Sequence, residues 1–197
     1  MLSSISPFGE RSRNSRWVVT VIAYLVGSVA GGALTGLVAG AVGEIAFIWI
    51  DAEAGLLILA IAAAIGLAAD LGVGGLRVPS IHRQVNEDWL TTYRGWVYGT
   101  GFGFQLGLGF ATIVATSTVW LTFIAAAMTG SLARAVMLGV LFGFARGILI
   151  LATARITDPA ALRDLFRTIA AQAPGINHVA RVVAGLTAIT ATAGLLA

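Results

Sequence analysis

Two long runs without a charged residue constrain this chain more than any other feature. They cover residues 17–43 and 95–132, which is 27 and 38 residues. A helix needs about 20 mostly apolar residues to cross the hydrocarbon core of a bilayer. Only 11% of the 197 residues are charged, whereas soluble domains carry about 25%. The sequence therefore predicts an all-α, polytopic membrane helical bundle.

The apolar runs predict five membrane spans in one transmembrane domain, residues 17–197. We expect these spans at residues 17–42, 54–74, 96–129, 135–154 and 179–197, after an N-terminal tail at residues 1–16. The first run is longer than the 7–15 apolar residues of a signal peptide, which favours a retained helix. Between the last two spans, Asp158-Pro159 is typical of a helix start and Pro174-Gly175 of a turn.

The third span is expected to be broken, because residues 95–132 are too long for one straight helix and short for two complete spans. Charge bias favours a single crossing, since it puts the tail and the connectors 75–95 and 155–181 on one side. All twelve basic residues are Arg, and with abundant Ala and Gly they suggest a bacterial source. We expect the protein in the inner membrane with its N-terminus in the cytoplasm. Arg134 is the one arginine that this topology places on the outer side.

Glycine recurs at every fourth position in the first and third spans. Such stripes let helix backbones approach closely in lipid, and the packing candidates are Gly32, Gly36, Gly40, Gly99, Gly103 and Gly107. We expect the break of the third span within residues 115–120, where Thr116, Ser117 and Thr118 supply hydroxyl groups. Broken helices mark many transport sites. Alternatively, the hydroxyls bond to carbonyls one turn earlier and the glycines serve only packing.

Arg146 is the charged residue that the sequence places deepest in a span. Intramembrane ionisable groups are candidates for function, and Asp70 or Gln105 could be its partner. These three residues and the hydroxyls of residues 116–118 form the candidate substrate pathway. The alternative is structural: a long Arg can reach the interface, or an Arg–Asp pair can join two helices.

The order of motifs resembles a known family. "LRVPSIHRQVNEDW", "GTGFGFQLGLGFATIVATSTVWLTFIAAAMTG", "SLARAVMLGVLFGFARGILIL" and "VARVVAGLTAITATAGLL" are similar to the second half of the thiol–disulfide membrane transporters of cytochrome c biogenesis, the CcdA/DsbD family. The first two spans resemble the end of that family's first half. The resemblance implies an incomplete inverted repeat that lacks the first helix. The family's Pro and redox Cys at each break are missing, so it implies a scaffold without thiol chemistry.

These features favour a small transporter, or the membrane subunit of one, with an unknown substrate. The alternative is a non-catalytic subunit of a larger membrane complex. No enzyme is expected, because the sequence has no HExxH motif and no Ser/His arrangement. The chain has no cysteine, and we expect no metal, no cofactor and no nucleic acid. The expected partners are the lipid bilayer, other membrane subunits or a second copy.

Overall fold

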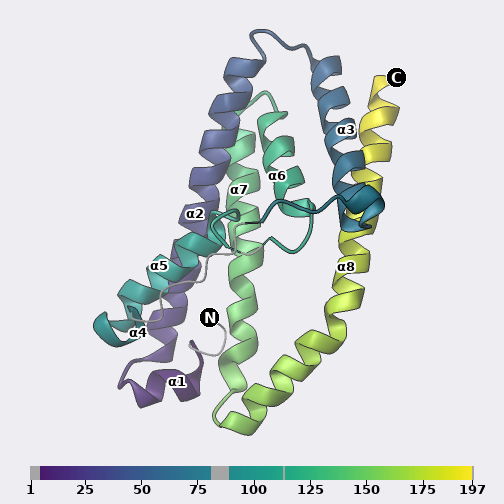
Figure 1. Cartoon of the computed structure of the whole chain (residues 1–197). Helices are drawn as coiled ribbons and strands as arrows, with labels where there is room; N and C mark the ends of the chain where they lie inside the picture. The colour runs from purple at the N-terminus through teal and green to yellow at the C-terminus, as the bar shows by residue number, and fades with distance from the viewer. Residues whose placement is uncertain (1–4, 81–88, 113, 197) are drawn as a thin grey trace.

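The computed structural model describes residues 5–80, 89–112 and 114–196, and these residues form an all-α membrane bundle without strands. Its long helices are α2 (Trp17–Ala46), α3 (Ala52–Asp70), α7 (Leu132–Gly147) and α8 (Pro159–Leu195). The 3₁₀ helix η2 (Ile148–Arg155) continues α7. Within the described ranges, these four segments are long and apolar enough to cross a membrane. Figure 1 shows how these helices are arranged in the bundle.

The third crossing is broken, as predicted. Helix α5 (Gly95–Gly107) rises from one end of the bundle and α6 (Thr118–Ala127) continues to the other, with residues 108–117 between them near mid-height (Figure 1). The break starts earlier than the predicted residues 115–120, and Thr118 already belongs to α6. Gly109 has a φ of +76°, a conformation that only glycine adopts cheaply. The break therefore begins beside this glycine, before the chain reaches its hydroxyl groups.

Helix α2 packs between α5 and α7 through glycine contacts on two of its faces. A Cβ atom on Gly27 or Gly31 would overlap the carbonyl oxygens of α5, at Thr100 and Phe104. On the other face, Cβ atoms on Gly32 and Gly36 would overlap the carbonyl oxygens of Gly139 and Ala135 in α7. The glycines of α5 pack in the same way against carbonyl groups of α2: Gly99 on Thr20, Gly103 on Tyr24 and Gly107 on Ser28. Gly40 meets the Cβ atom of Ala135. All six candidate glycines thus lie at helix contacts.

The described part of the N-terminal segment is folded, although the sequence suggested a tail at residues 1–16. Helix α1 (Pro7–Ser12) packs against the end of η2, with Ile5 and Glu10 fully buried. The hydroxyl of Thr153 donates to the carbonyl of Ile5 at 3.0 Å. The N–H of Phe8 donates to the carbonyl of Ile156 at 3.1 Å. These bonds fix the segment to the end of the bundle.

The last helix begins twenty residues earlier than the predicted span at residue 179. The carboxylate of Asp158 caps it by accepting from the N–H groups of Ala160 and Ala161, which confirms the predicted helix start. The predicted turn at Pro174-Gly175 is wrong, because Pro174 lies inside α8. A proline removes one backbone bond and bends a helix without having to end it. Figure 1 shows α8 curving along its length.

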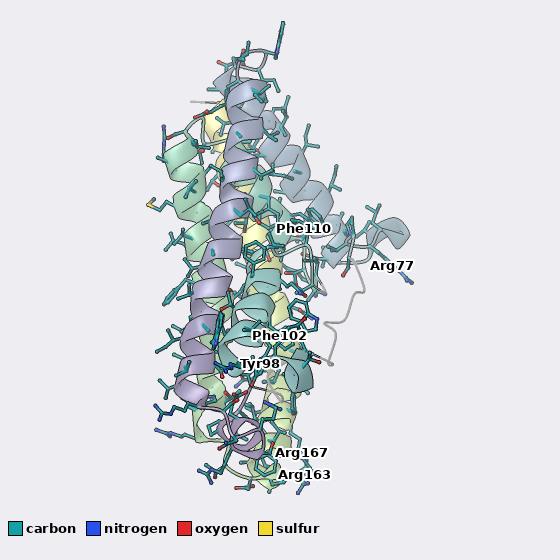
Figure 2. All side chains as sticks on the ribbon, turned by 90° about the vertical axis from the view of Figure 1, so that its left-hand side faces the viewer. Arg77, Tyr98, Phe102, Phe110, Arg163 and Arg167 are labelled. Carbon is teal, nitrogen blue, oxygen red and sulfur yellow. The ribbon has the colours of Figure 1, made fainter. Side chains whose placement is uncertain are left out.

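Whereas Arg77 lies near mid-height (Figure 2), three connecting segments meet at one end of the bundle. Helix α1, the short α4 (Trp89–Thr92) before α5, and the link from η2 to α8 all lie there (Figure 1). Helix α3 ends at Asp70, four residues before the predicted end of its span, and the 3₁₀ turn η1 (Val73–Gly75) follows. Arg83 falls outside the described residues.

We predict that Gly103→Ala destabilises the protein by about 1–3 kcal/mol, the usual cost of overpacking. The new methyl group would overlap the carbonyl of Tyr24 and push α5 from α2. The measurement is thermal unfolding in detergent. The control is Gly175→Ala, where no atom lies within 4 Å of the new Cβ. Equal melting temperatures for the two variants would contradict the role of the glycine contact.

Candidate functional site at the broken helix

The break lies near mid-height of the bundle, and the length of α2 and the tryptophans relate this level to the middle of a bilayer. Helix α2 has 30 residues and is about 45 Å long, which matches a bilayer with its headgroups. Trp17 and Trp96 mark the α1 end of the bundle, and the exposed Trp49 marks the other. Tryptophan is enriched at both membrane interfaces. Residues 108–117 lie about halfway between these levels (Figure 1).

Asp70 holds the α6 side of the break. One of its carboxylate oxygens accepts from the N–H of Ser117 at 2.9 Å, and the other accepts from the Ser117 hydroxyl at 2.6 Å. Beside it, the hydroxyls of Thr116 and Thr118 share a hydrogen bond of 2.8 Å. Helix α6 starts here, and an anion next to a helix N-terminus is favourable. The carboxylate therefore stabilises the first turn of α6.

Arg146 holds the α5 side of the break. Its guanidinium donates to the carbonyl of Gly109 at 3.2 Å and to the hydroxyl of Thr112 at 3.0 Å. It also lies over the ring of Phe142, 5.4 Å from the centroid. The carbonyls at a helix C-terminus lack partners within the helix and favour a cation. Within the described residues no ion pair joins Arg146 to Asp70, so the two charges bind opposite sides of one break.

A cavity of about 330 Å³ opens beside Asp70. Its polar lining comes from three parts of the chain: the break, the end of α3 with the residues after it, and α8. These residues are Asp70, Arg77, Ser80, Thr116, Asn177 and Arg181. Ser80 is fixed there, because its hydroxyl accepts from the N–H of Val114 at 2.9 Å. The cavity therefore combines both signs of charge with hydroxyl and amide groups.

The structure brings only part of the predicted pathway together. Asp70 and Thr116 line the cavity, while Ser117 and Thr118 lie directly behind them. Arg146 is engaged on the other side of the break, and Gln105 is half-buried in α5, away from the cavity lining. Among the described residues, no three His, Asp or Glu cluster as a metal site would require.

Four polar lining residues were missed from the sequence: Arg77, Ser80, Asn177 and Arg181. Arg77 and Ser80 follow α3 in a segment read as a connector, and Figure 2 shows Arg77 near mid-height, pointing away from the bundle. Asn177 and Arg181 are four residues apart, a spacing that places two side chains on one helix face. That signal was lost because residues 155–181 were interpreted as a connector.

A second buried polar cluster surrounds Glu10 at the α1 end. Its carboxylate accepts from Arg13 at 2.8 Å, from Thr20 at 2.8 Å and from Tyr98 at 2.5 Å. Burial alone would lower the pKa of Arg13, but its hydrogen bonds with Glu10 and Tyr98 raise that pKa above the ordinary value. Arg13 thus stays charged, and the cluster joins α1, α2 and α5.

The chain is similar to two proteins of the same name. It is 32% identical over 155 residues to the methylamine utilization protein MauF of Paracoccus versutus. The matched region covers 74% of this chain and 54% of that protein. The protein of that name from Paracoccus denitrificans is 32% identical over 151 residues, or 73% and 53% of the two chains. The chain thus spans about half the length of the curated relatives it matches. No family model matches the chain. No solved structure matches it either.

We predict that Arg146→Leu lowers the stability of the folded protein by about 1–3 kcal/mol, because the carbonyl of Gly109 and the hydroxyl of Thr112 lose a half-buried charged donor. Thermal unfolding in detergent measures the loss. The control is Arg134→Leu, which removes an exposed Arg from the same helix. If both variants unfold at the same temperature, Arg146 does not hold the break.

Proposed function

We propose that this protein is a membrane component of methylamine utilization that moves a small polar solute through the site at the broken helix. The cavity beside Asp70 carries the proposal, because it sets charged and hydroxyl groups at mid-depth next to two helix ends. Irregular backbone is tolerated at this depth only where protein buries it or a cavity wets it. The names of the similar Paracoccus proteins supply the physiological setting.

The position of Arg77 supports a wet cavity. This side chain is exposed near mid-height of the bundle (Figure 2). A charged residue at the bilayer centre costs about 2.5–3.5 kcal/mol on insertion scales. Water or a second protein in contact with Arg77 would remove most of that cost. Acyl chains would not.

A partner subunit is the second candidate. Helix α8 contacts mainly α3, and only 11% of its most apolar 18-residue stretch is buried. Polar residues such as Gln172 and His178 lie on its exposed surface. A neighbouring membrane protein that covers this side of α8 would enclose the cavity. In that arrangement the chain completes a site instead of forming one alone.

We further propose the inner membrane of a bacterium, with the α1 end in the cytoplasm. The arginines at that end support this orientation through the positive-inside rule. The CcdA/DsbD-like scaffold remains part of the proposal, with the hydroxyls of residues 116–118 where that family has redox cysteines. We propose a non-catalytic role, since the chain has no thiol of its own.

Thiol labelling tests whether water reaches the cavity. The chain has no native cysteine, so Thr116→Cys can be labelled alone with a charged, membrane-impermeant reagent. We expect it to react at least about tenfold faster than Leu186→Cys, because thiols exposed to lipid ionise poorly. Leu186 is an exposed apolar residue of α8. Equal rates in the native membrane would contradict a solute pathway.

Growth and copurification separate the two candidates. Deleting the gene in its own host should abolish growth on methylamine while growth on a sugar is unchanged. Asp70→Ala on a plasmid should fail to restore growth, whereas Arg134→Gln should restore it.

The purified chain, reconstituted alone in vesicles, should take up methylammonium if it is a transporter. A partner subunit should instead copurify with a second membrane protein that shields Thr116→Cys from the reagent.

A further inference from the structure

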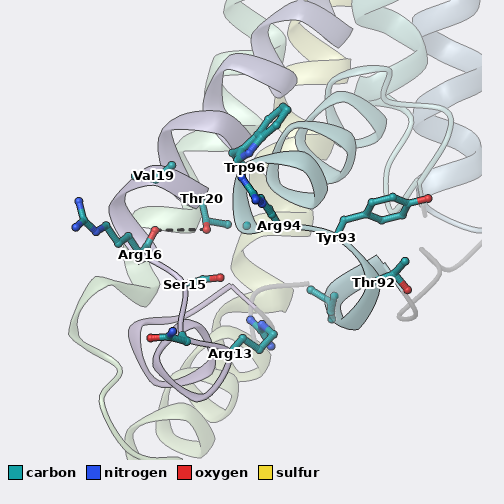
Figure 3. Close-up of a pocket in the computed structure, with 12 residues that line it drawn as sticks. Arg13, Ser15, Arg16, Val19, Thr20, Thr92, Tyr93, Arg94 and Trp96 are labelled. Carbon is teal, nitrogen blue, oxygen red and sulfur yellow. Dashed lines mark hydrogen bonds between the residues drawn. The ribbon is translucent and has the colours of Figure 1, made fainter.

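A second and larger cavity, of about 750 Å³, lies at the α1 end of the bundle. It opens between the link from α1 to α2 and the start of α5, and Figure 3 shows the side chains around it. We call it the arginine cavity, because Arg13, Arg16 and Arg94 line it together with Thr20, Tyr93 and Trp96. The proposed solute pathway does not use it.

The arginines give the cavity a net positive charge. Arg16 and Arg94 are exposed, and no acidic group within 4.0 Å was found for either among the described residues. In Figure 3 the side chains of Arg13 and Arg94 come from opposite walls, while Arg16 extends outward from the rim. Arginine presents a planar fork of donors that matches the oxygens of a phosphate group.

Glu10 does not cancel this charge. Its carboxylate is fully buried and accepts from Arg13, Thr20 and Tyr98. Arg13 is the cation that balances it, which leaves Arg16 and Arg94 in excess.

The backbone adds to the attraction for an anion. Helices α2 and α5 both begin at this cavity, and neither has a side chain that caps its first turn. The hydroxyl of Thr20 lies beside Gly95, where a Cβ atom would be only 2.5 Å from it. This close contact sets the two helix starts side by side. Free N–H groups and the helix dipole favour an anion at such a place.

The rim of the cavity suits a molecule with an apolar part. Tyr93 and Trp96 are half-exposed at the level of the membrane interface. From there, Val18, Val19 and Ile22 form an exposed apolar face along α2 toward the bilayer centre. An acyl chain that follows this face would have its headgroup at the arginine cavity. Basic pockets between membrane helices are typical sites for anionic headgroups.

We propose that the arginine cavity is a binding site for a phosphate group, carried by an anionic phospholipid headgroup or present as free phosphate. Arg94 and the starts of α2 and α5 hold the phosphate against the wall that Arg13 forms, and Arg16 adds a second unbalanced charge at the rim.

Native mass spectrometry of the full chain in detergent tests the site, with dioleoyl phosphatidylglycerol and dioleoyl phosphatidylcholine as probes. We expect the wild type to prefer phosphatidylglycerol, and the double variant Arg16→Gln/Arg94→Gln to lose that affinity by about thirtyfold, or about fivefold for each arginine. The matched control is Arg163→Gln/Arg167→Gln. It removes two exposed arginines at the same end of the bundle (Figure 2).

Calorimetry with inorganic phosphate separates the two sources. Binding of phosphate that depends on Arg16 and Arg94 identifies free phosphate as a ligand, and binding of phosphatidylglycerol alone identifies the lipid. A wild type that retains both lipids equally and binds no phosphate would overturn the proposal. So would equal losses in the two double variants, because general surface charge would then explain the binding. Circular dichroism of both double variants confirms that each is folded.

Discussion

The whole arrangement depends on backbone contact between helices. Lipid tails are as apolar as leucine, so no hydrophobic force drives membrane helices together, and close packing has to do so. Helix α2 meets this constraint on two faces, with Gly27 and Gly31 against α5 and Gly32 and Gly36 against α7. Because three helices are held this closely, their side chains leave little room between them. Small hydroxyl groups still fit there, such as that of Ser28, which donates to the carbonyl of Gly143 in α7 at 2.7 Å.

The break in the third crossing uses two charges for two helix ends. Asp70 lies at the positive end of α6, and Arg146 lies at the negative end of α5. Each charge comes from a different neighbouring helix, α3 or α7, so the break is fixed by tertiary structure as well as by its own sequence. An ion pair between them would have left both helix ends without a partner. With the charges apart, each side of the irregular backbone has a charged hydrogen-bond partner.

The sequence predicts the fold well and the site partly. Uncharged length gives the spans, and glycine spacing indicates which faces pack. The position of the break was not predicted correctly. The break begins at Gly109, and the hydroxyl-rich residues after it do not indicate the backbone conformation of this glycine. The cavity was not predicted in full because Arg181, which lines it beside Asp70, was assigned to a connector. In the structure Arg181 belongs to α8, which continues through Pro174. Glu10 was missed because its three donors come from residues 13, 20 and 98, which only the fold brings together.

The bond between Thr153 and Ile5 joins residues 148 positions apart. During synthesis, Ile5 therefore leaves the ribosome long before Thr153, the residue that bonds to it. Helix α2 must enter the bilayer with both glycine faces bare and wait for two later helices. The first face is covered once α5 has been made, and the second once α7 ends at residue 147.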